Sequence, residues 1–172
     1  MNSKLMLKAT VITLLMPGTV TLLLPYFILH RPGIADLPGF SVTAVFSIIA
    51  GLAGFTVLLH CIWGFAFHGN GTLAPIDPPK VLVVHGLYRH TRNPMNLAII
   101  VVLLSEALFF YSLSLLIYAA VAFLSFHLFV IFYEEPHLRT QFGESYEEYF
   151  KSTPRWRITT RAFIPRNNLD EL

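Results

Sequence analysis

Long apolar blocks without a charged side chain are the feature that most restricts how this chain can fold. Residues 9–29, 37–67 and 115–133 contain no Asp, Glu, Lys or Arg. A helix of about 20 residues crosses a hydrocarbon core of about 30 Å. Only 13% of the 172 residues are charged, against about 25% in soluble domains. These blocks therefore predict an integral membrane protein.

The predicted fold is all-α: an integral-membrane helical bundle of about four transmembrane helices, followed by a C-terminal interfacial helical segment. One membrane domain, residues 1–172, is expected to contain spans at about residues 9–29, 41–67, 94–110 and 115–133. The apolar run at residues 9–29 is too long for a cleaved signal peptide. A loop at residues 71–93 is expected to bind a cofactor, and residues 134–172 to form an interfacial tail in the cytosol.

The positions of the Lys and Arg residues predict the orientation of this bundle. With four spans, eleven of the twelve fall on one side of the membrane, and Arg31 falls on the other. The positive-inside rule then places both termini and the cofactor loop in the cytosol. A bacterial inner membrane fits so short a chain, and an endoplasmic-reticulum membrane is left open.

The basic stretch KVLVVHGLYRHTRNPMN, residues 80–96, lies between two apolar blocks. A quarter of all cationic side chains lie in it, at Lys80, Arg89 and Arg92. Asn93 is a favourable N-cap, and Pro94 suits the first helical position. Gly86 permits a tight turn just upstream. A helix that begins behind a basic, glycine-containing loop is a ready site for an anionic group.

Two adjacent carboxylates, Glu134 and Glu135, end the last apolar block. Residues 111–114 are the expected turn between the third and fourth spans, which would form a helical hairpin. The open end of that hairpin carries Arg92 and Asn93 on one helix and both glutamates on the other. The pair is either a solvated helix end or a site where a carboxylate accepts hydrogen bonds from an ammonium or hydroxyl group of a ligand.

Other titratable residues of the apolar blocks have less specific interpretations. Glu106 lies inside the third span, about 18 Å along the helix from Pro94. His60 and His127 would either touch a ligand or pack as hydrogen-bonded histidines, and Cys61 is expected to be a buried thiol. The sequence contains no metal-binding pattern, no dinucleotide-binding G-x-G-x-x-G after a strand and no nucleophile elbow. Neither a metal nor a nucleic-acid partner is expected.

Two segments together resemble a known superfamily. GTLAPIDPPKVLVVHGLYRHTRNPMN, an apolar hairpin and then EEPHLRTQFGESYEEYFKSTPRW, within residues 71–156, resemble the isoprenylcysteine carboxyl methyltransferase and phospholipid methyltransferase superfamily. The resemblance implies a membrane-embedded methyltransferase that uses S-adenosylmethionine. It also implies that the cofactor lies at the cytosolic end of the hairpin, and that a lipid-like or isoprenoid substrate enters from the bilayer.

The resemblance also implies roles for individual residues. Glu134 is expected near the reacting centre, as the catalytic residue. The expected cofactor-binding residues are Lys80, Val81, Leu82, Val83, Gly86, Tyr88, Arg92, Asn93, Pro94, Met95, Asn96 and Glu135.

The chain departs from the superfamily pattern at four positions. The Arg-His-Pro-x-Tyr motif carries Asn93 in place of His and Asn96 in place of Tyr, and Ala98 replaces a Gly two residues later. Val130 stands where the prenylcysteine enzymes have an Arg that helps to hold the substrate carboxylate. The fold and the cofactor are therefore expected to transfer better than the substrate.

The predicted reaction moves a methyl group from S-adenosylmethionine to a carboxylate or amine of a lipid-like or isoprenoid substrate. Two alternatives stay open. One is an NADPH-dependent membrane reductase of an isoprenoid or sterol-like lipid, for whose dinucleotide a chain of 172 residues has little room. The other is a non-catalytic membrane subunit with the same fold.

Overall fold

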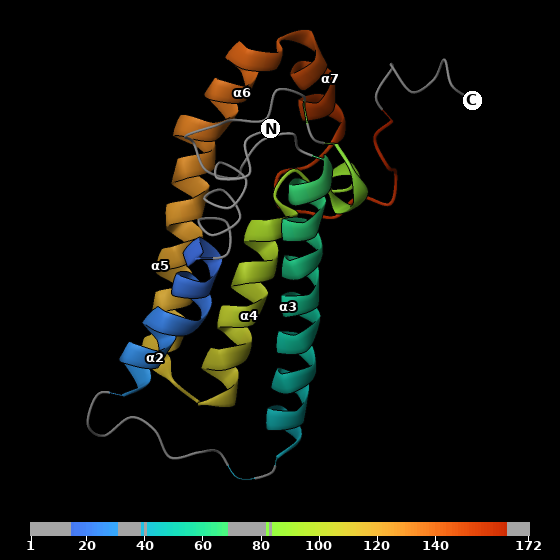
Figure 1. Ribbon diagram of the computed structural model, residues 1–172. Coiled ribbons are helices and arrows are strands. Elements are labelled where there is room, and N and C mark those ends of the chain that lie inside the picture. The colour runs from blue at the N-terminus through green and yellow to red at the C-terminus, as the bar shows by residue number, and fades with distance from the viewer. Residues whose placement is uncertain (1–14, 31–38, 40, 69–81, 83, 165–172) are drawn as a thin grey trace.

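The computed structural model describes residues 15–30, 39, 41–68, 82 and 84–164, and within these ranges every regular element is a helix. The predicted all-α class is confirmed for this part of the chain (Figure 1). The helices are η1 (Thr19–Leu23), α2 (Leu24–Leu29), α3 (Val42–His68), η2 (Gly86–Arg89), α4 (Pro94–Phe109), α5 (Leu113–Phe129), η3 (Val130–Glu134), α6 (Glu135–Phe142) and α7 (Glu144–Ser152).

Two helices are long and apolar enough to cross a membrane, Val42–Gly64 and Leu113–Phe142. Two shorter apolar helices, Leu15–Leu29 and Pro94–Phe109, lie beside them. At 1.5 Å per residue, the 16 residues of α4 extend about 24 Å, which is less than a hydrocarbon core of about 30 Å. By length and composition, two helices of full length therefore match the four predicted spans.

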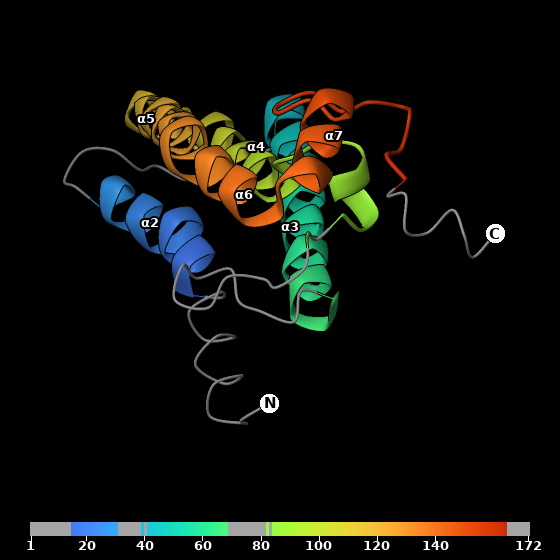
Figure 2. The ribbon, with the colours of Figure 1, turned by 90° about the horizontal axis from the view of Figure 1, so that it is seen from above.

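Helix α4 lies at the centre of the bundle, between α3 and α5 (Figures 1 and 2). It comes close to α3 at Gly54, where an added Cβ would lie 3.0 Å from Val101 Cγ1 and 3.2 Å from the Ala98 carbonyl oxygen. Because this position has no side chain, the two helices can pack closely here through van der Waals contacts.

Helices α4 and α5 form the predicted hairpin, with Leu103 and Ala119 in its buried core. The turn is shorter than the predicted residues 111–114, because the hydroxyl of Ser112 accepts a hydrogen bond from the Leu115 backbone amide and starts α5 at Leu113. Tyr111 turns the chain with a φ of 48°. We define the polar end of the molecule as η2, α6, α7 and residues 153–164. The open end of the hairpin, opposite this turn, points to the polar end.

Both π-helical turns end two residues before a proline, at Pro25 and Pro136. A proline ring clashes with the carbonyl group four residues earlier in an α-helix. The wider turn accommodates the ring, and the Glu135 amide donates to the Val130 carbonyl oxygen instead. The helix therefore continues past both glutamates to Phe142, so these residues are not the solvated helix end that was one of their two interpretations.

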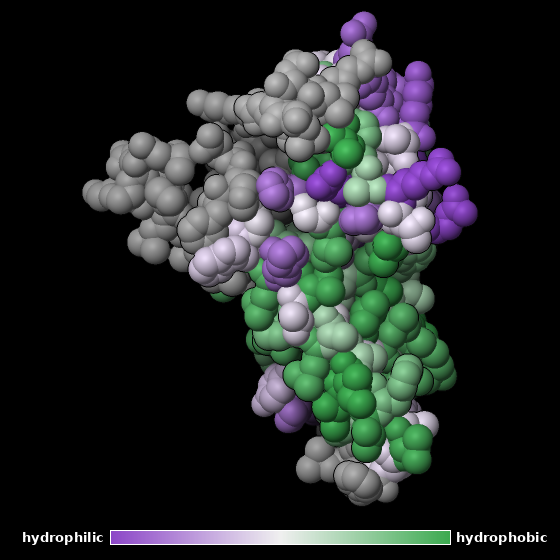
Figure 3. Space-filling view, turned by 90° about the vertical axis from the view of Figure 1, so that its right-hand side faces the viewer, coloured by the Kyte–Doolittle hydropathy of each residue, from purple (hydrophilic) through white to green (hydrophobic). Residues whose placement is uncertain are grey.

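Hydrophobic side chains cover the sides of the bundle, and hydrophilic side chains gather at the polar end (Figure 3). Large apolar residues such as Phe46, Trp63 and Phe132 are more than 60% exposed. A lipid environment accounts for this exposure, because apolar surfaces of this extent are unfavourable in water. The predicted tail is indeed a broken helix, in which α6 and α7 meet at Gly143.

Candidate functional site

The C-terminal segment, residues 153–163, lies along the loop that precedes α4. Backbone amides link the two at three places: Arg92 N donates to Pro154 O, Thr159 N to His90 O and Phe163 N to Arg89 O, all at 2.9–3.0 Å. The Tyr149 hydroxyl at the end of α7 donates to the Tyr88 carbonyl oxygen at 2.6 Å. The loop and the C-terminal segment therefore form one layer above the bundle, and we call this layer the strap.

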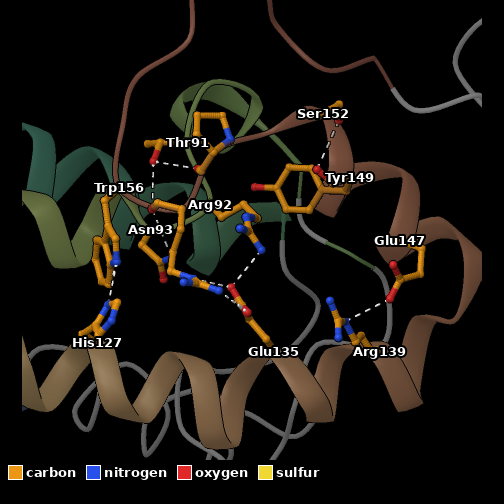
Figure 4. A network of polar contacts seen from close by, with 12 residues as sticks. Thr91, Arg92, Asn93, His127, Glu135, Arg139, Glu147, Tyr149, Ser152 and Trp156 are labelled. Carbon is orange, nitrogen blue, oxygen red and sulfur yellow. Dashed lines mark hydrogen bonds and ion pairs between the residues drawn. The ribbon is translucent and has the colours of Figure 1, made fainter.

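An ion triad joins the strap to the helix Leu113–Phe142, which we call the long helix (Figure 4). Glu135 Oε1 accepts from Arg92 Nη1 at 2.8 Å and from Arg155 Nε at 2.7 Å, and Oε2 accepts from Arg155 Nη2 at 2.8 Å. The side chains of Arg92 and Glu135 are only 9% and 8% exposed. The hydrogen bond to Glu135 raises the pKa of the Arg155 guanidinium. This geometry confirms that the two ends of the hairpin meet.

The guanidinium of Arg92 has further contacts that hold it in the wall of the site. It lies 4.1 Å from the centre of the Phe150 ring, and the Arg139 guanidinium lies 4.3 Å from the same ring. Its Nε is buried and has no hydrogen-bond partner among the described residues. A buried guanidinium N–H without a partner is costly, so this atom is a candidate donor to an anionic ligand.

A small cavity of about 20 Å³ lies between the strap and the long helix. Arg92, Asn93, Val130, Glu134 and Tyr146 contribute to its lining. This volume has room for one water molecule. Among the described residues, Glu134 forms no ion pair of its own, which distinguishes it from its neighbour Glu135.

Tyr88 lies in η2, and the charge of Glu134 influences the protonation of its hydroxyl. Burial, followed by the charges of Cys61, Glu134 and Tyr149, raises the pKa of Tyr88 well above its usual value. Tyr88 therefore stays a neutral hydroxyl group at physiological pH. Cys61 is 2% exposed, which confirms the expected buried thiol.

The turn before Tyr88 depends on a glycine. Gly86 has a φ of 55°, and a Cβ at this position would lie 3.2 Å from Nε2 of His60. A side chain here would be strained by its backbone conformation and would also crowd the histidine. The predicted tight turn is confirmed, and His60 of α3 borders the loop.

The prediction for the Asn93 side chain is wrong in its local detail. Asn93 occupies the N-cap position of α4, and Pro94 is the first helical residue, but the Asn93 side chain makes no capping hydrogen bond. Its Nδ2 instead donates to the Arg155 carbonyl oxygen at 3.3 Å, and its Oδ1 accepts from Asn96 Nδ2 at 3.4 Å. The amide group is turned toward the C-terminal segment because the Arg155 carbonyl oxygen accepts its hydrogen bond, and the same oxygen also accepts one from the Thr91 hydroxyl at 3.3 Å.

Two further predicted cofactor-binding residues, Met95 and Leu82, are not among those that line the cavity. Met95 packs against the hydrophobic core of the bundle, away from the cavity. Leu82 is half-buried in the segment before η2. The remaining three, Lys80, Val81 and Val83, lie outside the described residues.

Two other residues that the sequence singled out lie outside the cavity. Nδ1 of His127 is hydrogen-bonded to Trp156 Nε1 at 3.0 Å, so this histidine attaches the strap to α5. Glu106 lies near the far end of α4, about 18 Å along the helix from Pro94. The packed alternative for His127 is therefore correct.

Three residues of the cavity or the triad were not among the predicted site residues. The side chain of Arg155 is bound to Glu135. Tyr146 and Tyr149 are buried at the site, 2% and 4% exposed. Their position after the two glutamates was visible in the sequence, but nothing local indicated that the chain would fold back over the loop.

Comparison with known proteins identifies the family of this chain. A family model described as phospholipid methyltransferase matches residues 42–145, which is more than half of the chain. The matched region runs from the start of α3 into α7 and contains the loop, the hairpin and both glutamates. No match was found among curated proteins or among solved structures. The superfamily expected from the sequence is confirmed, and the chain belongs to the phospholipid methyltransferase family.

Proposed function

We propose that the protein transfers a methyl group from S-adenosylmethionine to an amine of a lipid-like substrate at the membrane surface. Family membership supports the reaction class. The observation that carries the residue assignment is the meeting of Arg92 with the carboxylates 134 and 135 around one cavity.

The described residues fit one end of the proposed cofactor. The partnerless Nε of Arg92 and the N-terminus of α4 favour a carboxylate. Glu134, which has no ion pair among the described residues, suits a positively charged sulfonium group. S-adenosylmethionine carries both groups, and when bound it would supply an electrophilic methyl group on a sulfonium sulfur.

Charge and polarity at the cavity favour an amine acceptor over a carboxylate acceptor. Val130 is apolar, 1% exposed and part of the cavity wall, at the position where the prenylcysteine enzymes have an arginine. The other nearby cation, Arg155, is already bound to Glu135. An acceptor carboxylate would therefore lack a free counterion among these residues, whereas an amine could bind between Glu134 and the neighbouring tyrosines.

The contribution of the protein to this reaction would be alignment and proton transfer. An amine must be neutral to act as a nucleophile, and Glu134 is the carboxylate in position to take its proton. Tyr88, whose hydroxyl remains neutral, would orient the reacting group by hydrogen bonding. Alignment alone can contribute about 7–11 kcal/mol to lowering a barrier, so a site with few polar groups is sufficient.

The test measures transfer of a labelled methyl group from S-adenosylmethionine into a total lipid extract by the purified protein in bilayer vesicles. Label that survives mild base is expected, because an N-methyl group is stable to base and a methyl ester is hydrolysed. Glu134→Gln should lower the rate at least about 100-fold, while Glu144→Gln, on the exposed start of α7, should match the wild type. Base-labile label would refute the amine acceptor, and wild-type rates in Glu134→Gln would refute the proposed catalytic residue.

A further inference from the structure

Both carboxylate oxygens of Glu135 accept hydrogen bonds from arginines. Arg155 binds it with two parallel N–H groups at 2.7 and 2.8 Å, and Arg92 binds it with one at 2.8 Å. A two-pronged guanidinium–carboxylate contact fixes geometry more strictly than a single bond. Arg155 therefore fixes the orientation of this carboxylate, and Arg92 adds a single hydrogen bond to Oε1.

Hydrogen bonds from Arg92 and its neighbour Asn93 hold the backbone around Arg155. Arg92 N donates to Pro154 O at 3.0 Å, and Asn93 Nδ2 donates to Arg155 O at 3.3 Å. The contacts thus form a closed ring that runs from the Arg92 backbone through residues 154 and 155 to Glu135 and back to the Arg92 side chain. In such a ring, a shift of any member moves the others.

Charge balance gives Arg155 a second effect on the cavity. The adjacent carboxylates 134 and 135 carry two negative charges, and Arg92 alone would leave the group with a net charge of −1. Arg155 restores neutrality at Glu135, so Arg92 needs only one nitrogen for that carboxylate. The Nε of Arg92 then stays without a partner in the described structure, and Glu134 stays without an ion pair there.

We infer that Arg155, which lies beyond the residues matched by the family model, is a positioning residue for methyl transfer. It acts through Glu135 to hold Arg92 in the cavity wall and to leave Glu134 available. This inference rests on the proposed function, since the ligand that Arg92 and Glu134 would contact is the cofactor.

The test is a double-mutant cycle of Arg155→Met and Glu135→Gln in the full-length protein, with calorimetric affinity for S-adenosylmethionine as the readout. Arg155→Met should weaken binding about tenfold, and the double variant should be no weaker than the weaker single variant, because residues of one network are not additive. Arg155→Lys, which keeps the charge but loses the two-pronged contact, should fall between the wild type and Arg155→Met. Arg157→Gln, two residues along on the exposed side of the strap, should bind as the wild type does.

A thermal unfolding cycle on the same ligand-free variants separates a positioning role from a merely structural one. Non-additive midpoints would support the contact between Arg155 and Glu135, and additive midpoints would overturn it. Unchanged affinity in Arg155→Met, or an equal loss in Arg157→Gln, would overturn the positioning role alone. A folded wild type that binds no S-adenosylmethionine would instead overturn the proposed function, and the role of Arg155 with it.

Discussion

Replacement of Glu135 by Gln should destabilise the protein much more than the same replacement at the neighbouring Glu134. Glu135 forms ion pairs with two arginines in the ion triad, one of which is only 9% exposed, and among the described residues no other carboxylate pairs with them. Gln keeps nearly the same shape but loses the charge, so two guanidinium groups would remain in a largely buried place without an anion. The effect therefore measures the electrostatics of the triad rather than its packing.

The size of this effect follows from the burial of the triad. Removal of one partner of a buried ion pair typically costs about 3–5 kcal/mol. The lower end, about 3 kcal/mol, is expected because Arg155 is 25% exposed and keeps part of its hydration. For a chain of this size, about 2–4 °C accompanies each kcal/mol, so the unfolding midpoint should fall by about 6–12 °C. Glu134→Gln should change the free energy of unfolding by about 1 kcal/mol or less.

Thermal unfolding of both variants in the same detergent, followed by circular dichroism, provides the measurement. Arg92→Gln is an informative third variant, since it removes a cation and leaves Glu135 bound to Arg155, and it should cost less than Glu135→Gln. Equal midpoints for the two glutamate variants would refute the reasoning. They would mean that the carboxylate of Glu135 is solvated rather than held between the arginines.

Three further predictions follow from local geometry. Gly86→Ala should lower the free energy of unfolding, measured by denaturation, by about 1–2 kcal/mol. The alanine would be forced to a φ of 55° and its Cβ would lie against His60. The control Gly64→Ala has open space around its Cβ and should leave the free energy of unfolding unchanged. Gly54→Val should separate α3 from α4 and cost about 1–3 kcal/mol, measured as a lower unfolding midpoint; an unchanged midpoint would contradict the close approach. Burial raises the pKa of Tyr149, so above pH about 10 the unfolded chain releases a proton that the folded chain keeps, and the free energy of unfolding should fall with rising pH. Tyr149→Phe should flatten that decline, and an equally steep decline in this variant would contradict the assignment.

The hairpin and its consequences could be predicted from the sequence because they follow from local signals. Proline at position 94 and the apolar run behind it located the start of α4 to the residue. The short break after Phe110 predicted a hairpin, and the hairpin in turn brought Arg92 and Glu135 together, which the 2.8 Å contact bears out. These features depend on helix propensity, hydrophobicity and chain connectivity, all of which a single sequence records.

The features that were mispredicted depend on contacts between distant segments. Asn93 is a good N-cap in isolation, but a carbonyl group of the strap competes for its amide. Arg155 was not among the predicted site residues, because only the folded chain places it against Glu135. The two glutamates were open to interpretation as a solvated helix end, yet a π-helical turn accommodates Pro136 and the helix continues. None of these outcomes has a local sequence signal, because each is decided by a partner more than ten residues away or by a rare backbone geometry.

The central claim is that the basic loop and Glu134 contact the same molecule of S-adenosylmethionine. Calorimetric titration of the purified protein in detergent with S-adenosylmethionine, and separately with NADPH, tests it most directly. The account predicts saturable binding of S-adenosylmethionine by the wild type, clear weakening in both Tyr88→Ala and Glu134→Gln, and no binding of NADPH. Binding of NADPH alone, or S-adenosylmethionine binding that both variants retain in full, would contradict it.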